Sequence, residues 1–172
     1  MDNADAIESI IDYDKDYTFD YFALTTLIRA YLLKFDNRTI ERPQDLWMRV
    51  TLTVTGNEFN LDKIKETYKS LSSGMYTHAT PTLFNSGLKM QQLSSCFLIG
   101  MEDDSIEGIF NTIKDCALIS KTAGGIGMHA HNIRGSGSRI KSTNGKSNGL
   151  IPFLKIFNET AKSVDQGGGK RK

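Results

Sequence analysis

The stretch Leu93-Ser-Ser-Cys-Phe-Leu-Ile99, followed by Asp103-Asp-Ser-Ile-Glu107, decides the fold of the second half of the chain. Its apolar run is nearly continuous, which is typical of a short strand buried on both faces. The acids and the hydroxyl that follow are typical of a helix start, with Asp104 as the N-cap and Glu107 as its capping-box partner. We therefore predict a strand that leads directly into a helix.

The same alternation continues to the end of the chain. A second short strand is predicted at residues 126–131, and residues 134–149 form a glycine-rich loop. Ser147 or Asn148 is predicted to cap a final helix. A parallel β-α-β unit of this kind needs further strands to bury its faces. Residues 93–164 therefore predict an incomplete part of a larger α/β barrel or sheet.

The first half of the chain is predicted to be helical. Apolar residues at helical spacing predict three helices, at residues 17–35, 43–56 and 60–74. Residues 75–90 are predicted to be an extended loop. The first residues are acidic and weakly patterned, which predicts a frayed arm. We therefore divide the chain into an acidic arm at 1–16, a helical domain at 17–90 and an α/β part at 91–172.

The composition limits the class of protein to which the chain can belong. The chain has 172 residues, 39% hydrophobic residues and a net charge of +1, all typical of a soluble globular domain. Residues 134–172 hold nine bases against two acids, which indicates that this part meets an anion such as phosphate. Two cysteines are too few for a secreted disulfide scaffold, and no apolar run approaches the roughly 20 residues that span a bilayer. We therefore expect a reducing location, cytosolic or nuclear, and take the cytoplasm as the prediction.

Cys96 is the first candidate for a catalytic residue. Ser94 and Ser95 place hydroxyl groups beside its thiol at the start of the predicted strand, where a substrate can be held. The alternative is a buried structural thiol, because free cysteine is among the most buried residue types. Cys116 lies in the middle of a predicted helix between apolar residues, and we interpret it as part of the core.

The loop at 134–149 is the second candidate. It contains four glycines, four bases and no acid, so its backbone can approach a phosphate closely and its side chains can neutralise one. A mobile surface loop is the alternative. The adjacent Asp103 and Asp104 exceed what one helix cap needs, and one of them is a candidate ligand for a ribose hydroxyl. A thiol together with such a loop predicts redox chemistry on a phosphorylated substrate.

The three histidines do not predict a metal site. His129 and His131 share one face of a short predicted strand, and His78 lies far from them in the sequence. Neither group is joined by the cysteines at a spacing typical of metal ligands. We therefore predict no bound metal.

The chain also carries a series of ordered motifs. They are Tyr76-Thr-His-Ala-Thr-Pro-Thr-Leu-Phe-Asn85, Gln92-Leu-Ser-Ser-Cys-Phe-Leu98, Asp103-Asp-Ser-Ile-Glu-Gly108, Cys116-Ala-Leu-Ile-Ser-Lys-Thr-Ala-Gly-Gly-Ile-Gly127, Thr143-Asn-Gly-Lys-Ser-Asn-Gly149 and Val164-Asp-Gln-Gly-Gly168. Together they resemble the large (α) subunit of ribonucleotide reductases, most closely the class I eukaryotic and viral type. The resemblance covers residues 17–171.

This resemblance implies an α/β fold. A helical N-terminal part would be followed by the first strand-helix-strand-helix of a ten-stranded α/β barrel, which is incomplete in this chain. The family reduces the ribose 2′-hydroxyl of ribonucleotides by thiyl-radical chemistry, producing deoxyribonucleotides for DNA synthesis. Cys96 matches the redox-active thiol that becomes a disulfide. The residues that match substrate ligands are Thr80, Ser95, Cys96 and Gly125.

The resemblance also implies an allosteric site at a dimer interface for a nucleoside triphosphate effector (ATP, dATP, dTTP or dGTP). Its matching residues are Asp104, Ser105, Ile106, Lys121, Arg134, Ile140, Lys141 and Ser142. The loop that relays effector identity to the substrate site matches Asp165, Gln166, Gly167 and Arg171. No cofactor is expected to bind directly, because the family takes its radical from a separate metal-containing small subunit.

The expected partners follow from the same resemblance. They are the remaining C-terminal part of the α subunit, a second α subunit, the small radical-generating β subunit and a thioredoxin- or glutaredoxin-type reductant, with no membrane or nucleic acid. The family's radical cysteine and the second cysteine of the redox pair match nothing in the chain. We therefore expect a fragment that is inactive alone. The alternatives are a catalytically dead remnant that keeps effector binding or dimerisation, and a small basic nucleic-acid module.

Overall fold

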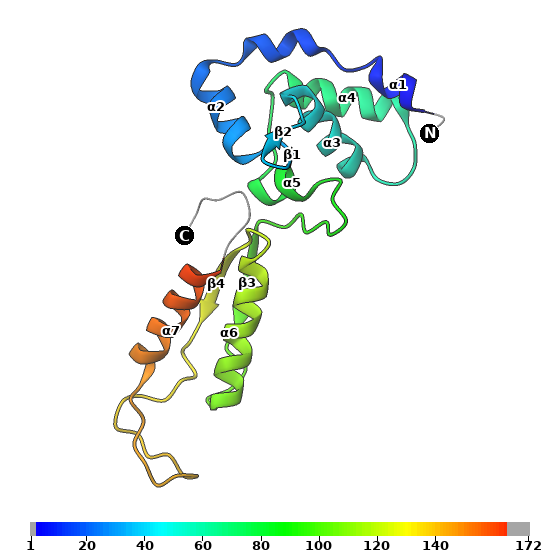
Figure 1. Ribbon diagram of the computed structural model, residues 1–172. Coiled ribbons are helices and arrows are strands. Elements are labelled where there is room, and N and C mark those ends of the chain that lie inside the picture. The colour runs from blue at the N-terminus through cyan, green and yellow to red at the C-terminus, as the bar shows by residue number, and fades with distance from the viewer. Residues whose placement is uncertain (1–2, 165–172) are drawn as a thin grey trace. The chain divides into compact units, whose positions relative to one another are not determined.

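The structure is a computed structural model that describes residues 3–164 (Figure 1). The chain divides into two compact units, Met1–Leu93 and Ser94–Lys172. The first unit is helical, and the second combines helices with a parallel pair of strands. The predicted order, a helical part followed by an α/β part, is confirmed. Residues 94–164 do not form a closed barrel.

The first unit is built from short helices and one small hairpin. Its elements are α1 (Ala4–Glu8), η1 (Tyr13–Thr18), α2 (Tyr21–Ala30), β1 (Lys34–Phe35), β2 (Arg38–Thr39), α3 (Pro43–Thr55), α4 (Leu61–Ser72) and α5 (Thr80–Asn85). Helices α3 and α4 pack against each other and carry most of the core. Its most deeply buried apolar side chains include Leu46, Val50, Ile64, Tyr68 and Leu71.

Local signals place α3 and α4 where the sequence predicts them. Pro43 begins α3, and Gly56 ends it with a φ of 91°, a conformation that favours glycine. The Asn60 side chain caps α4 by accepting a hydrogen bond from the Lys63 N–H at 3.0 Å. Both predicted helices are therefore confirmed.

Three predictions for the first unit are wrong. The helix predicted at 17–35 is broken, because Asp20 caps a new helix by accepting from the Ala23 N–H at 2.7 Å. The predicted frayed arm is ordered, since the Tyr68 hydroxyl accepts from the Asp12 N–H at 3.0 Å and helices α1 and η1 form. The predicted loop at 75–90 contains α5, whose start carries Pro81, a residue suited to the first helical turn.

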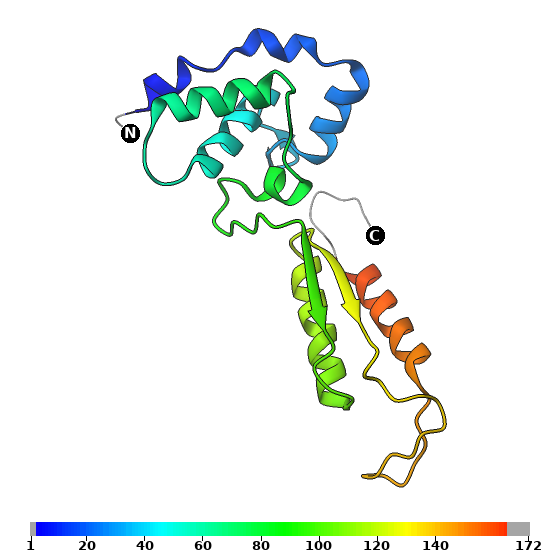
Figure 2. The ribbon, with the colours of Figure 1, turned by 180° about the vertical axis from the view of Figure 1, so that it is seen from behind.

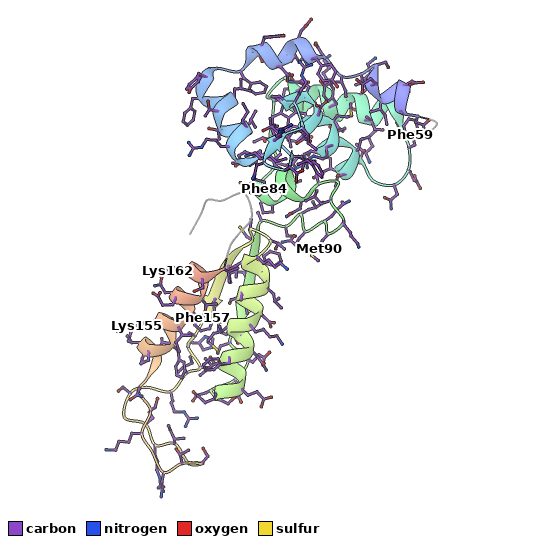
Figure 3. All side chains as sticks on the ribbon, in the orientation of Figure 1. Phe59, Phe84, Met90, Lys155, Phe157 and Lys162 are labelled. Carbon is purple, nitrogen blue, oxygen red and sulfur yellow. The ribbon has the colours of Figure 1, made fainter. Side chains whose placement is uncertain are left out.

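The second unit has the predicted β-α-β-α order. Its elements are β3 (Cys96–Gly100), α6 (Ile106–Ser120), β4 (Gly125–His129) and α7 (Leu150–Ser163). The strands pair in parallel, from Cys96 with Gly125 to Gly100 with His129, and α6 connects them. Figure 2 shows β3 in front of α6, and Phe153 and Phe157 of α7 pack against the core that α6 forms with Met128 of β4, so both helices lie on the same face of the sheet. Phe157 points inward from α7, whereas Lys155 and Lys162 point away from the sheet (Figure 3).

The prediction that β3 is buried on both faces is wrong for this chain. Burial alternates along the strand: Phe97 and Ile99 lie on the helix side, and Leu98 on the other side is 94% exposed. An apolar run shows that both faces of a strand are apolar, but it does not say what covers them. Within residues 94–164, the helices cover one face.

Both helix caps of the second unit also differ from the prediction. Ser105, not Asp104, caps α6 by accepting from the Gly108 N–H at 3.0 Å. The N-cap of α7 is Gly149, with a φ of 78°, and Ser147 accepts its N–H at 2.9 Å. The Asp104 carboxylate is therefore not needed as a helix cap, and it lines a cavity at the start of α6.

Candidate functional site

The thiol of Cys96 lies on the face of the sheet that α6 and α7 leave open. The residue is exposed, so it is not the buried structural thiol of the alternative interpretation. The Ser95 hydroxyl donates to its sulfur at 3.6 Å. Gly125 stands beside it in the parallel register, and its N–H donates to the Ser95 carbonyl at 2.7 Å. A β-carbon at Gly125 would lie 3.9 Å from the Cys96 sulfur.

The structure thus brings together three of the four predicted substrate residues. Ser95, Cys96 and Gly125 form one cluster at the start of the two parallel strands. Thr80, the fourth, is the first residue of α5 in the helical unit. The glycine keeps the space beside the sulfur free of any side chain, which suits the close approach of a substrate.

Cys116 has a different environment on α6. It is half-buried, and burial followed by the charge of Asp115 raises the pKa of its thiol. Since the thiolate is the reactive species, we predict that iodoacetamide at pH 8 alkylates Cys96 at least several times faster than Cys116. Peptide mass spectrometry over a time course measures both rates. Equal rates, or faster reaction at Cys116, would contradict the exposed position of Cys96.

A second site lies at the N-terminal end of α6. It is a cavity of about 1100 Å³ between the start of α6, the basic loop and the start of α7. Its volume is sufficient for a nucleotide-sized ligand. The lining residues that the sequence predicts as effector ligands are Asp104, Ser105, Ile106, Arg134, Ile140, Lys141 and Ser142. We refer to it below as the loop cavity.

The loop cavity is positively charged. Its one acid is neutralised, because the Arg134 Nε donates to the Asp104 carboxylate at 2.5 Å and the same guanidinium donates to the Asp104 carbonyl at 3.1 Å. Lys141 and Lys146 also line it and form no ion pair with any residue of 3–164. An excess of unpaired bases around a cavity favours a polyphosphate ligand.

The basic loop is held in shape by its own backbone. Arg139 and Lys146 form an antiparallel bridge, and the Ile140 N–H donates to the Gly145 carbonyl at 2.9 Å. Arg139 also donates to the Asn144 side chain at 2.6 Å. The loop therefore folds back on itself like a hairpin and carries its basic side chains there. Figure 1 shows it beyond the ends of α6 and α7.

Two features of the cavity escape the sequence prediction. Lys121, predicted as an effector ligand, lies at the C-cap of α6, about 20 Å from the cavity by the rise of a helix of this length. Pro152 and Phe153 of α7 line the cavity but carry no local signal of a ligand site. Arg139 and Lys146 also line it, and the charge of the loop does indicate them.

The remaining predictions concern the histidines, the specificity loop and membrane spans. The rings of His129 and His131 stack with centroids 4.5 Å apart, and no group of three metal-ligating side chains occurs within residues 3–164. The predicted specificity-loop residues Asp165, Gln166, Gly167 and Arg171 lie outside the described residues. None of the helices in the described part of the chain is long and apolar enough to cross a membrane.

Both units of the chain match domains of one known protein family. Residues 17–91 match the all-alpha domain of ribonucleotide reductase, and residues 94–172 match its barrel domain. The chain belongs to the ribonucleotide reductase large-subunit family. The match to the all-alpha domain ends just before the first strand of the second unit begins.

Relatives with curated names match nearly the whole chain. The ribonucleoside-diphosphate reductase large subunit of Trypanosoma brucei brucei is 54% identical over 97% of the chain, and the large chain of Cryptosporidium parvum is 56% identical over 100% of it. Large chain 2 of Saccharomyces cerevisiae is 54% identical over 99%. These matches cover 20%, 21% and 19% of the respective relatives, so the chain spans about a fifth of their length.

Proposed function

We propose that the chain supplies the first redox thiol and the effector site of a ribonucleoside-diphosphate reductase large subunit. The observation that carries this proposal is the Cys96 cluster: an exposed thiol beside a serine hydroxyl and a glycine, on the open face of a parallel strand pair. Ser95 and Gly125 would hold the substrate next to the sulfur. Thr80 of the first unit is proposed as a further substrate ligand. The remaining strands of a ten-stranded barrel would come from the other parts of the subunit.

The overall reaction assigns Cys96 a defined role. Its thiol and a second thiol, supplied by another part of the large subunit, are oxidised to a disulfide. The ribose C2′–O bond breaks, C2′ gains a hydrogen, and the oxygen leaves as water. The radical that this chemistry needs is supplied by a separate metal-containing small subunit. A thioredoxin- or glutaredoxin-type reductant returns the disulfide to two thiols, and a reducing compartment such as the cytoplasm suits this cycle.

The loop cavity would bind a nucleoside triphosphate. Lys141 and Lys146 would neutralise its phosphates, and Asp104 would accept a hydrogen bond from the ribose while Arg134 holds the carboxylate in place. Lys121 cannot reach the cavity of its own chain, since it lies at the far end of α6. A second copy of the subunit would supply it, and the effector would then lie at a dimer interface.

A chimera tests the proposed function. Residues 1–172 replace the matching segment of Saccharomyces cerevisiae large chain 2, and the product is assayed with the yeast small subunit, a ribonucleoside diphosphate and a dithiol reductant. We expect effector-dependent formation of the deoxyribonucleotide. A chimera that assembles with the small subunit but forms no product would overturn the proposal.

Effector binding provides a second prediction. Replacing Asp104 by Ala should weaken dTTP binding to the chimera by about 10- to 100-fold, because the ribose loses a charged acceptor and Arg134 loses its partner. Isothermal titration calorimetry measures the change. The control is Lys155→Ala, since Lys155 points away from the sheet on α7 (Figure 3) and should leave the affinity unchanged. An unchanged affinity for Asp104→Ala would refute the effector assignment.

A second candidate function is supported by one observation. All residues that line the loop cavity lie between Asp104 and Phe153, within a single unit. The chain alone would then be a non-catalytic binder of nucleoside triphosphates. Titration of the isolated chain with dTTP distinguishes this function from a role that requires the whole large subunit.

A further inference from the structure

Tyr31 and Thr80 meet at the junction of two helices of the first unit. Tyr31 follows the last residue of α2, and Thr80 is the first residue of α5. Their hydroxyl oxygens lie 3.3 Å apart, although 49 positions separate them in the sequence. Both side chains are partly buried, so this hydrogen bond is shielded from most of the solvent.

The Tyr31 ring is held in a fixed position. It stacks on the ring of Phe84 with centroids 5.0 Å apart and an interplanar angle of 21°. Phe84, labelled in Figure 3, lies one turn after Thr80 on the same helix. The Tyr31 N–H also donates to the Leu27 carbonyl at 2.8 Å. The hydroxyl of Tyr31 is thus directed at Thr80 by contacts with both α2 and α5.

The far end of α5 is held as well. The Arg49 guanidinium donates to the carbonyls of Leu83 and Ser86 at 3.2 and 2.7 Å. These bonds fix where α5 ends, and the Tyr31 contact fixes where it begins. Thr80 therefore stands on a helix that is restrained at both ends, which limits the directions that its hydroxyl can take.

The chemical difference between a phenol and an aliphatic hydroxyl favours one direction for this hydrogen bond. The aromatic ring withdraws electron density from the phenol oxygen, so the Tyr31 hydroxyl is the better donor and the Thr80 hydroxyl the better acceptor. When Thr80 accepts from Tyr31, its own proton is free for another acceptor. An anionic oxygen of a bound substrate is such an acceptor.

We propose that Tyr31 is a positioning residue that orients the Thr80 hydroxyl to donate to the substrate. The inference rests on the proposed function, in which Thr80 is a substrate ligand. Tyr31 itself does not touch the substrate. Its hydroxyl acts by occupying the lone pair of Thr80 and by pointing the Thr80 proton away from α2.

Tyr31→Phe in the chimera described above tests the inference. The variant keeps the stacked ring and loses only the hydroxyl. We expect KM for the ribonucleoside diphosphate to rise about 3- to 10-fold while kcat changes less than twofold, because the lost bond serves binding and transition state equally. The dTTP affinity should be unchanged. Equilibrium dialysis of the ribonucleoside diphosphate checks the same change without turnover.

Two further variants separate positioning from a general structural effect. Tyr13→Phe removes another tyrosine hydroxyl of the first unit, one that donates to Asp45 at 2.9 Å, and should leave KM unchanged. Adding Tyr31→Phe to Thr80→Val should not raise KM further, because the hydroxyl that Tyr31 orients is already gone.

Each outcome decides the inference. Fully additive effects of Tyr31→Phe and Thr80→Val, an unchanged KM for Tyr31→Phe, or an equal rise in KM for Tyr13→Phe would overturn it while leaving the proposed function standing. An unsubstituted chimera that neither binds nor reduces the ribonucleoside diphosphate would overturn both, since Thr80 would then have no substrate to hold.

Discussion

Replacing Arg49 by Met is expected to lower the free energy of unfolding of the first unit by about 3–5 kcal/mol. Arg49 and Glu41 form a largely buried ion pair, with side chains that are 13% and 7% exposed. The guanidinium donates to both carboxylate oxygens at 2.6 and 3.0 Å. Without it, Glu41 becomes a buried charge with no cation to pair with, and the carbonyls of Leu83 and Ser86 lose their donor.

Urea unfolding followed by tryptophan fluorescence measures this loss. The only tryptophan of the chain, Trp47, lies in the core of the first unit and reports on that unit. Two variants serve as controls. Arg42→Met breaks the pair with Asp16, in which Arg42 is 50% exposed, and should cost only about 1 kcal/mol.

The double variant Glu41→Gln/Arg49→Met separates the buried charge from the lost contacts. It removes the unpaired carboxylate, so it should be more stable than Arg49→Met alone. A double variant that is no more stable than the single one would show that the loss comes from packing and backbone contacts, and the ion-pair explanation would be wrong.

Local signals in the sequence predict the helices around this ion pair but not the pair itself. Pro43, Gly56 and Asn60 act on residues within one turn of themselves, so they can be recognised without a structure. The Arg49 guanidinium instead joins Glu41 to carbonyl groups more than 30 positions away. Such contacts depend on how helices pack, and a single sequence does not encode them in any pattern of fixed spacing.

In the loop cavity, too, local features are predicted from the sequence and long-range contacts are not. The charge of the loop predicts that an anion binds there, and the family motifs predict seven of the fifteen residues that line the cavity. Asp104 is assigned wrongly to a helix cap because its true partner, Arg134, lies 30 positions away. Pro152 and Phe153 are missed because they reach the cavity only through the packing of α7 beside α6.

The sequence also does not predict that one face of the sheet is uncovered. The apolar run of β3 predicts two apolar faces, and this is correct in composition. Leu98 is nonetheless 94% exposed, because the helices within residues 94–164 cover only the other face. Cys96 lies on the same open face as Leu98. The burial prediction fails because this face is uncovered, and the same exposure gives the Cys96 sulfur access to a substrate.

That access leads to the largest effect that we expect. In the chimera, Cys96→Ser should reduce deoxyribonucleotide formation by at least about 10³-fold, equivalent to about 4 kcal/mol in the barrier. A hydroxyl has nearly the size of a thiol and keeps the contact with Ser95, but it cannot be oxidised to a disulfide. Binding of dTTP should be unchanged, because the loop cavity contains no residue of the Cys96 cluster.

Cys116→Ser is the matched control. It makes the same chemical change on α6, at a half-buried thiol outside the Cys96 cluster, and should retain most of the activity. Product formation measured over repeated turnovers distinguishes the two variants. If Cys96→Ser turned over like the parent, the sulfur would not be the reductant. If Cys116→Ser alone lost activity, the redox thiol would lie on the helix and the open face of the sheet would need another explanation.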